Sequence, residues 1–428
     1  MPPATAFVLT HRSHNDRNGY TASFQALAIT RSLGRRGVPV VRVHPGSREL
    51  SLSSRYCTAV EVSPNVHESE PALLEFLLTA ARKYPGPRVL IPASDDTAYF
   101  VGRHYDALSA AYRIPSPRAA TIETIIDKQR QYEAARGLGI PIPETHFPES
   151  LAEVQALAPR LKTYPYIIKP NVAHRWRMAS VKQKLGPGGG IKAVLVRNAE
   201  ELLAQYGKVS EVDAAVMIQQ VIGGGDERLF CFYGYFDARS QPLGHCVRYK
   251  IRQMPPRFGY STLMESCEND VVVEQSVRLL KGLHYQGIVG VEWKLDPASG
   301  EHKLIEINAR ATNAVGLPMA CGVDLPHMAF ADALGEPVAQ VTRWKTGVKW
   351  LWFTEDLWAA RELYRKRELS LGRWLKSLRG RKTYAVYAAD DLRPLFVELG
   401  MFLKGELAHR LRLLERRAQP RARLGPAG

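Results

Sequence analysis

Residues 290–310, GVEWKLDPASGEHKLIEINAR, contain two runs in which apolar and polar residues alternate. The segment 296–300, DPASG, lies between the runs and is rich in turn-forming residues, so the stretch predicts a β-hairpin. If the hairpin is symmetric about Ser299, Glu292 lies directly opposite Glu306. The second run is expected to place Ile305, Ile307 and Ala309 on one face and Leu304, Glu306, Asn308 and Arg310 on the other.

Two carboxylates that face each other on neighbouring strands repel, which destabilises the pair unless a cation lies between them. Glu292, Glu306 and Asn308 offer only oxygen ligands, the set that Mg²⁺ prefers. Arg310 follows on the same face and could stabilise charge on a transferring phosphoryl group. The alternative is a solvated polar strand face, and the opposed Glu292 weighs against it.

Length and composition are typical of a globular protein of two or three domains. The chain has 428 residues, of which 45% are hydrophobic and 23% charged. We expect no membrane-spanning helix and no signal peptide. The five cysteines are scattered without metal-type spacing, so disulfides are not expected and a cytoplasmic location is. The net charge is +16, but residues 361–428 hold 17 Lys and Arg against 7 Asp and Glu, which indicates a local basic appendage.

The first 120 residues predict an open α/β unit with a parallel sheet. Expected strands are Ala6–Thr10, Val38–Val43 and Arg88–Pro92, with helices at Thr21–Gly34 and Leu73–Arg82. The loop after the first strand, with His11, Arg12, His14 and Gly19, then lies at the sheet edge where such folds bind ligands. We interpret His11 and His14 as loop or capping residues and not as catalysts.

A second unit follows the proline-rich segment 114–117. A helix is expected over Thr121–Gly137, containing Asp127 and Lys128, and a strand over 166–170, YIIKP, which carries Lys169. Residues 186–190, GPGGG, precede Lys192. This loop could fold over phosphates with lysine support, or it could be a flexible hairpin turn; it lacks the P-loop pattern.

Two further stretches have two interpretations each. The segment 219–225, QQVIGGG, is either a strand-to-linker junction whose backbone pairs with an adenine edge or a simple loop. Arg248, Lys250 and Arg252 recur at every second residue and form either a solvated face or a site for an anionic substrate. Arg175, Arg177, Arg248 and Arg252 together suggest an acidic partner.

Taken together, the Asp127-Lys128 pair, YIIKP, the glycine loop, the QQVIGG junction and the Glu-rich hairpin resemble the ATP-grasp superfamily. The resemblance covers roughly residues 5–335 and is greatest to the carboxylate–amine ligase branch that includes D-aspartate ligase and the carbamoyl-phosphate synthase large subunit. It implies an α/β and α+β protein with a pre-ATP-grasp domain at 1–118, a two-lobed ATP-grasp domain at 119–338 and a basic helical extension at 339–428.

The resemblance also implies roles for individual residues. Glu292, Glu306 and Asn308 are implied as Mg²⁺ ligands, and Arg310 as the arginine near the γ-phosphate. One departure is Gln220, where the family often has Glu. The remaining implied ATP contacts are Lys128, Lys169 and Lys192 at the phosphates, Gln219, Gln220, Val221 and Ile222 at the adenine, and Glu227 at the ribose.

The implied activity is ATP-dependent ligation. A carboxylate takes the γ-phosphoryl group to become an acyl phosphate, and an amine then displaces phosphate. The expected cofactors are ATP and Mg²⁺, and the partners are small-molecule or peptide carboxylates and amines, with no specific nucleic acid. Two alternatives are a nucleotide-binding or nucleic-acid-associated module without turnover, and an acyl-phosphate- or carbamate-forming enzyme with a different acceptor.

The C-terminal region predicts a strand and turn over Thr383–Arg393 and a basic amphipathic helix over Pro394–Arg417. The helix could lie on an anionic membrane, dock on the body or meet a second subunit of a homodimer. We favour docking on the body or on a subunit. Its apolar stripe is Phe396, Leu399, Leu403, Leu407, Leu411 and Leu414.

Overall fold

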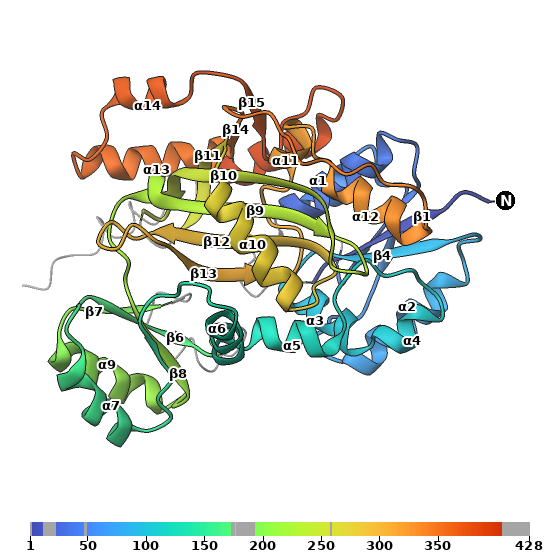
Figure 1. Ribbon diagram of the computed structural model, residues 1–428. Coiled ribbons are helices and arrows are strands. Elements are labelled where there is room, and N and C mark those ends of the chain that lie inside the picture. Colours follow the sequence, from blue (N-terminus) through green and yellow to red (C-terminus); the bar gives the residue numbers. More distant parts are fainter. Residues whose placement is uncertain are drawn as a thin grey trace, which may run out of the picture.

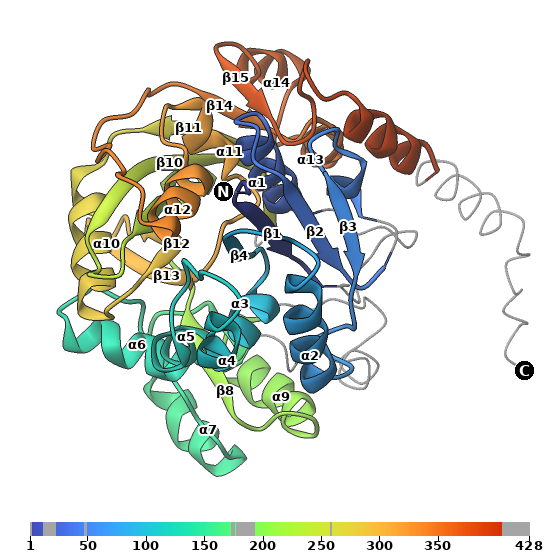
Figure 2. The same ribbon diagram turned by 90° about the vertical axis from the view of Figure 1, so that its right-hand side faces the viewer.

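The computed structural model describes residues 2–11, 23–46, 49–172, 176, 193–256 and 259–404. Their strands form three sheets (Figures 1 and 2). In Figure 1 the large sheet occupies the centre, the N-terminal sheet lies at the right and the smallest lobe hangs below on the left. The expected combination of an open α/β part with a two-lobed part is therefore confirmed.

The N-terminal sheet is parallel, with strand order β3-β2-β1-β4. Its central strands β1 and β2 are buried along their whole length, as helices on both sides of a parallel sheet require, and β2 buries Arg42 and His44 among apolar residues. Its strands are β1 (Thr5–Leu9), β2 (Val40–His44), β3 (Ala59–Val62) and β4 (Arg88–Pro92), and its helices are α1 (Phe24–Gly34), η1 (Leu50–Ser53), α2 (Glu70–Ala81), α3 (Asp95–Arg103) and α4 (Tyr105–Ser109).

The prediction of a single helix over 121–137 is wrong. The structure has two helices, α5 (Ala119–Ile126) and α6 (Lys128–Gly137), separated by Asp127. Asp127 has an extended backbone and its side chain accepts a hydrogen bond from the Arg130 backbone N–H, as an N-cap does. The break makes Lys128 the first residue of α6.

The small lobe is an antiparallel sheet with strand order β5-β8-β6-β7. Figure 1 shows α7 and α9 side by side on one side of this lobe, and they share an apolar cluster with β6 and β8. The glycine loop and Lys192 lie outside the described residues. The elements are β5 (Thr145–His146), α7 (Leu151–Leu157), η2 (Ala158–Arg160), β6 (Tyr166–Pro170), β7 (Val194–Val196), α9 (Ala199–Ser210) and β8 (Val216–Gln220).

The large sheet has seven strands in the order β13-β12-β9-β10-β11-β14-β15. All its pairings are antiparallel except that between β14 and β15. One apolar cluster joins its strand β9 to helix α1 and strand β1 of the N-terminal part. The elements up to residue 334 are η4 (Asp226–Arg228), β9 (Leu229–Phe236), β10 (Pro242–Met254), β11 (Tyr260–Cys267), α10 (Asp270–Gly282), β12 (Gly287–Leu295), β13 (His302–Asn308), α11 (Gly316–Ala320) and α12 (Leu325–Leu334).

The expected hairpin is β12 and β13, and Glu292 does pair with Glu306. The expected alternation along the second strand is wrong at its start. Trp293 pairs with Leu304, so Ile305 is skipped by a bulge, and Leu304 is buried in the same cluster as Ile307. The turn is tighter than symmetry about Ser299 requires, which shifts the pairs next to it by one residue. The bulge removes that shift, so Glu292 and Glu306 are still opposite each other.

Residues 339–404 complete the large sheet and cover one end of it. They contain β14 (Lys349–Leu351), α13 (Phe353–Arg365), α14 (Leu371–Ser377) and β15 (Lys382–Tyr384), followed by a helix over 393–404. Figure 1 shows α13 beside β10 and β11, with α14 above α13 in this view. A buried ion pair joins Arg31 of α1 to Asp391, whose Nε–Oδ2 distance is 2.9 Å.

Docking of the C-terminal apolar stripe on the body is wrong for the part of the stripe that the structure describes, whereas docking on a second subunit stays a prediction. Phe396, Leu399 and Leu403 are exposed, and Leu395 and Val397 pack against the body in their place. The helix therefore presents a different face to the body than the spacing indicated. Among the residues that the structure describes, no helix combines the length and hydrophobicity needed to span a bilayer.

Candidate active site

Two opposed carboxylates form the centre of the site. Glu292 of β12 and Glu306 of β13 are register partners, and Gly290 is the partner of Asn308. Lys128 reaches Glu306 with an Nζ–Oε1 distance of 3.0 Å, and Arg248 lies 3.8 Å from Glu292. The side chain of Glu306 is 42% exposed, whereas those of Lys128 and Arg248 are largely buried. The carboxylates thus face an opening that is walled by buried cations.

Lys169 of β6 brings the small lobe into this group. Burial lowers the pKa of Lys169 to about 8, while Glu306 and Glu292 oppose that shift and Lys128 adds to it. Lys169 therefore lies within electrostatic range of both carboxylates and of the second lysine. The predicted proximity of Lys169 to the acidic pair is confirmed.

Arg310 is held by a residue of the N-terminal part. Asp95, the first residue of α3, accepts two hydrogen bonds from the Arg310 guanidinium, at 2.8 and 2.9 Å. The Oδ1 atom of Asn308 accepts a third, at 3.3 Å. A bidentate pair fixes the plane of the guanidinium, so Asp95 orients Arg310 beside the acidic pair.

A small cavity of about 60 Å³ adjoins the Lys128–Glu306 pair. It lies between α3, α5 and β13, and its polar lining includes Asp95 and Asp96. Apolar side chains such as Ile122 and Ile307 close its other sides. The N-terminal part therefore forms one wall of the site.

The predicted linker begins where β8 ends. The Gln219 side chain is buried and donates to Thr145, with an Nε2–Oγ1 distance of 3.1 Å. The backbone N–H groups of Gln220 and Val221 donate to the carbonyl oxygens of Glu144 and Pro165. The edge of a ligand could therefore form hydrogen bonds only with the other backbone groups between Gln219 and the buried Ile222. The predicted ribose residue, Glu227, is exposed in η4.

Sequence reasoning missed Lys294, which holds the chain that follows this linker. Its Nζ donates to the carbonyl oxygens of Gly224 and Gly225, at 3.1 and 2.6 Å. Burial lowers its pKa, and Asp226 and Glu227 oppose that shift. Lys294 follows Glu292 by two residues on β12, so strand alternation could have placed it on the site face.

The three cations at every second residue of β10 do not act together. All three are buried, so the solvated-face interpretation is wrong. Arg248 and Lys250 face the site, where each interacts with Glu292. A register shift separates Lys250 from Arg252, and Arg252 instead forms a bidentate pair with Asp356 of α13. The anionic-substrate interpretation is therefore wrong for Arg252.

Several of the residues named from the sequence lie, with the glycine loop, outside the described residues. They are Arg12, His14, Gly19, Arg175, Arg177 and Lys192. The part of the site that the structure describes therefore consists of the hairpin, β6, the start of α6, β10 and the start of α3.

Comparison with solved structures defines the fold. The crystal structure of biotin carboxylase from Campylobacter jejuni in complex with β,γ-ATP matches with a TM-score of 0.60 at 17% identity, covering 81% of this chain and 74% of that one. A model of the family described as ATP-grasp in the biosynthetic pathway with Ter operon matches residues 250–355. The chain thus has the ATP-grasp fold, and its resemblance to that superfamily is confirmed.

Two curated relatives point to the same branch. D-aspartate ligase of Enterococcus faecium (strain Aus0004) is 24% identical over 294 residues, which cover 66% of this chain and 68% of the relative. The carbamoyl phosphate synthase large chain of Methanobrevibacter smithii is 25% identical over 230 residues, covering 52% of this chain. The match spans only 20% of that large chain. The chain is therefore similar to ATP-grasp ligases, as the sequence predicted.

Proposed function

We propose that the protein is an ATP-dependent ligase that activates a carboxylate as an acyl phosphate and joins it to an amine, releasing ADP and phosphate. The observation that carries the proposal is the opposed Glu292–Glu306 pair, surrounded by Lys128, Lys169 and Arg248. Two carboxylates that face each other on paired strands are unfavourable unless cations complete the site. The similarity to D-aspartate ligase supports the choice of a carboxylate and an amine as substrates.

The donor set fits Mg²⁺. Glu292, Glu306 and Asn308 present only oxygens and lie on two paired strands, and Glu306 is partly open to solvent. We propose these three residues as the ligands. When bound, Mg²⁺ supplies charge neutralisation between the phosphate oxygens and the attacking anion.

The remaining residues take up the nucleotide. Lys128 and Lys169, together with Lys192, neutralise phosphate charge, and the segment Gln219, Gln220, Val221 and Ile222 receives the adenine. The Glu227 carboxylate accepts hydrogen bonds from the ribose hydroxyls. We also propose domain boundaries near residues 118 and 338. ATP is bound between the two lobes of the domain that they enclose, because β6 and the hairpin belong to different sheets.

The reaction has two steps. An oxygen of the substrate carboxylate attacks the γ-phosphorus, and the bond to the β-phosphate oxygen breaks to release ADP. The amine nitrogen then attacks the carbonyl carbon, phosphate leaves with the C–O bond electrons, and the nitrogen loses a proton. Arg310, fixed by Asp95, stabilises charge on the transferring group, and no side-chain nucleophile is needed.

The test is ADP release from ATP and Mg²⁺ in the presence of pooled carboxylates and amines. The wild-type protein should release ADP only when both pools are present or when an activated acid can be trapped with hydroxylamine. Arg310→Ala should lower the rate by on the order of 10³ while nucleotide binding persists. Salt-sensitive nucleic-acid binding without ADP release under any pool would instead favour a non-catalytic module.

A further inference from the structure

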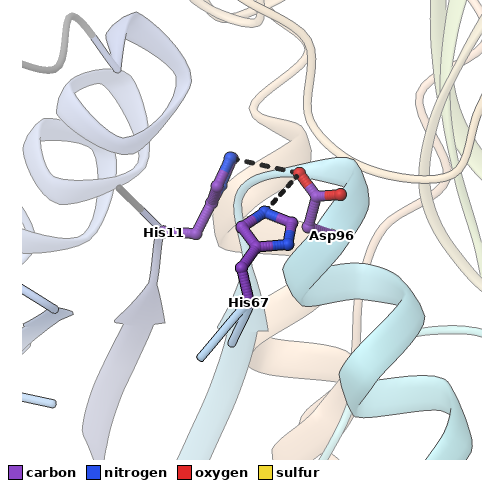
Figure 3. A group of neighbouring side chains, drawn as sticks. All are labelled: His11, His67 and Asp96. Carbon is purple, nitrogen blue, oxygen red and sulfur yellow. Dashed lines mark ion pairs between the residues drawn. The ribbon is translucent and has the colours of Figure 1, made fainter. Parts of the chain in front are cut away.

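A cluster of two histidines and one aspartate lies at the carboxyl edge of the N-terminal sheet. His11 follows β1, His67 precedes α2, and Asp96 is the second residue of α3. Figure 3 shows both imidazole rings directed toward the Asp96 carboxylate. The Nε2 atoms of His11 and His67 lie 3.1 and 3.7 Å from Asp96 Oδ2. One ligand atom from each residue lies within 4.8 Å of the other two.

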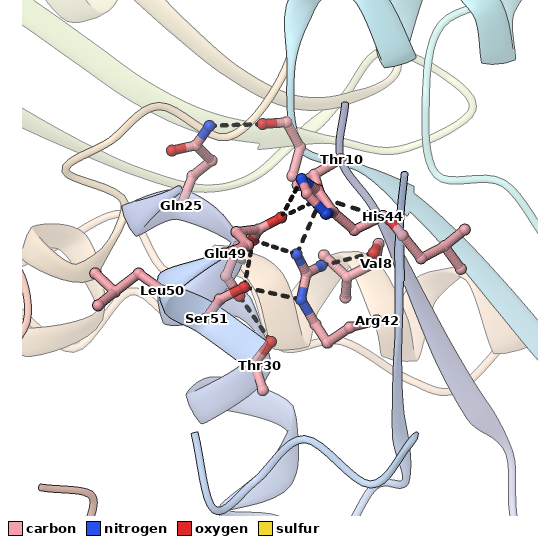
Figure 4. Close-up of polar contacts among 12 residues, drawn as sticks. Val8, Thr10, Gln25, Thr30, Arg42, His44, Glu49, Leu50 and Ser51 are labelled. Carbon is pink, nitrogen blue, oxygen red and sulfur yellow. Dashed lines mark hydrogen bonds and ion pairs between the residues drawn. The ribbon is translucent and has the colours of Figure 1, made fainter. Parts of the chain in front are cut away.

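The backbone around His11 is held by a buried polar network. The hydroxyl of Thr10 donates to the Glu49 carboxylate at 2.6 Å, and Glu49 also forms a fully buried ion pair with Arg42. Ser51 donates to the same carboxylate, and His44 Nε2 lies 3.4 Å from it. Figure 4 shows these side chains converging from β1, β2 and the segment after β2. The network holds the Thr10 side chain and thereby the backbone from which the His11 side chain starts.

The second anchor is the start of α3. Ser94 caps this helix through a capping box with Thr97, and Thr97 is fully buried. The backbone of Asp96 is thereby fixed on a rigid element. Two of the three residues thus occupy preorganised positions before any ligand arrives.

The donor chemistry differs from that of the hairpin site. Two imidazole nitrogens and one carboxylate suit Zn²⁺, Co²⁺, Ni²⁺ or Fe²⁺, whereas oxygen-only sets suit Mg²⁺. Ligand atoms about 2.0–2.1 Å from a tetrahedral Zn²⁺ lie roughly 3.4 Å apart, and the two His–Asp distances bracket that value. The ligand atoms of the two histidines lie within 4.8 Å of each other, so side-chain rotation can bring them onto one ion.

We propose that His11, His67 and Asp96 bind one divalent transition-metal ion of the Zn²⁺ class, with one or more positions left for water or a ligand. The position is next to the candidate active site, because the neighbouring Asp95 binds Arg310. Asp96, a proposed metal ligand, is thus the neighbour in α3 of Asp95, the residue that holds Arg310. The inference stands on the cluster geometry and does not depend on the proposed ligase activity.

The experiment uses the full chain, stripped with chelator and titrated with Co²⁺ in the presence of excess Mg²⁺. We expect one Co²⁺ per chain with a visible d–d absorption band, and displacement of the band by Zn²⁺. His67→Ala and Asp96→Asn should each lower Co²⁺ affinity by about tenfold or more. His104→Gln is the matched control, because His104 pairs with a single carboxylate, Glu70, at 3.1 Å.

Two controls accompany the titration. Glu306→Gln should leave the Co²⁺ band unchanged, because that residue belongs to the oxygen-only set. Circular dichroism and thermal melting without metal check that each variant is folded. The proposal is overturned if folded wild-type protein shows no band, or if His67→Ala and Asp96→Asn bind Co²⁺ as tightly as His104→Gln does. A His–Asp–His hydrogen-bonded cluster without metal would give that result.

Discussion

At the scale of single residues, the proposed phosphate contact of Lys169 predicts how nucleotide binding depends on pH. Its pKa is lowered to about 8, chiefly by burial, so the free protein loses this charge well below the usual lysine range near 10.4. Phosphates bind the charged form better. ATP affinity should therefore be steady below pH 8 and fall by up to about tenfold per unit above it.

Isothermal titration with ATP between about pH 6.5 and 9.5 measures this dependence. In Lys169→Arg the decline above pH 8 should disappear, because a guanidinium keeps its proton throughout that range. A decline of equal steepness in Lys169→Arg would assign the pH dependence to another group and contradict the role of Lys169.

Asp95 is a positioning residue for Arg310, and its removal should affect turnover more than binding. Asp95→Asn replaces a charged group that accepts through two oxygens by an amide that can accept through only one oxygen. We expect kcat for ADP release to fall by roughly 10²-fold, since misplacing a catalytic group by about 1 Å costs that much. The dissociation constant for ATP should change little.

Asp106→Asn serves as the control for Asp95→Asn. Asp106 also pairs with an arginine, Arg118, at 2.8 Å, but its side chain is 91% exposed. Exposed pairs contribute at most about 1 kcal/mol, so turnover should be unchanged. Equal loss of kcat in both variants would argue against a specific role for Asp95.

At the scale of elements, the hairpin shows what sequence periodicity can and cannot predict. Alternation and turn residues predicted that Glu292 lies opposite Glu306. The assumed symmetry about Ser299 gives this pair because a one-residue bulge offsets a turn that is tighter than expected. The bulge at Ile305 could not be predicted, since it depends on whether Leu304 or Ile305 packs better against the cluster behind the sheet. In the same way, Asp127 as an N-cap divides a helix whose apolar spacing is continuous.

Gly290 keeps the hairpin close to the loop that follows it. A Cβ at this position would lie 2.5 Å from Thr312 Cγ2, which is too close for any real contact. Gly290→Ala should destabilise the protein by about 1–3 kcal/mol and should weaken Mg²⁺-dependent nucleotide binding, because Asn308 is its register partner. Urea unfolding and titration with MgATP measure the two effects.

Gly372→Ala is the control for Gly290→Ala. Gly372 lies in α14, and a Cβ there has no neighbouring atom within 4 Å. Alanine in a helix is favoured over glycine by up to about 1 kcal/mol, so this variant should be as stable as the wild type or slightly more so. A stable Gly290→Ala protein with normal MgATP binding would contradict the packing argument.

At the scale of the whole molecule, periodicity and local motifs do not determine which residues far apart in the chain come into contact. Lys128 and Lys169 could be assigned to the acidic hairpin only through family resemblance, whereas their contact is a property of the folded chain. Asp95 and Lys294 were missed because neither belongs to a motif. The pair Arg252–Asp356 shows the same limit, since periodicity placed Arg252 with Arg248 and tertiary packing separated them.

The Arg252–Asp356 pair makes residues beyond 338 part of the central core. Both side chains are nearly inaccessible, at 4% and 0% exposure, and Asp356 also accepts from Thr262 and Trp374. Asp356→Ala leaves a buried guanidinium without its counter-ion, so we expect a loss of about 3–5 kcal/mol in the free energy of unfolding. Urea denaturation followed by tryptophan fluorescence measures it.

Glu362→Ala provides the comparison on the same helix. Glu362 pairs with Lys366 at 2.7 Å on the exposed side of α13, and such a pair contributes only about 0.3–0.5 kcal/mol. The double variant Arg252→Met/Asp356→Leu should recover much of the stability lost in Asp356→Ala. Equal, small losses of unfolding free energy in Asp356→Ala and Glu362→Ala would contradict the claim that the Arg252–Asp356 pair ties α13 to the core.

The ion pair between Arg31 and Asp391 has a consequence for biosynthesis. Asp391 also accepts hydrogen bonds from Ser54 and from the backbone of Arg55, so three points of the first 55 residues depend on it. A ribosome must translate 360 further residues after Arg31 before that carboxylate exists. During vectorial synthesis Arg31, Ser54 and Arg55 are therefore made long before their shared partner, and the contacts that tie this region to Asp391 can form only after residue 391 has been added.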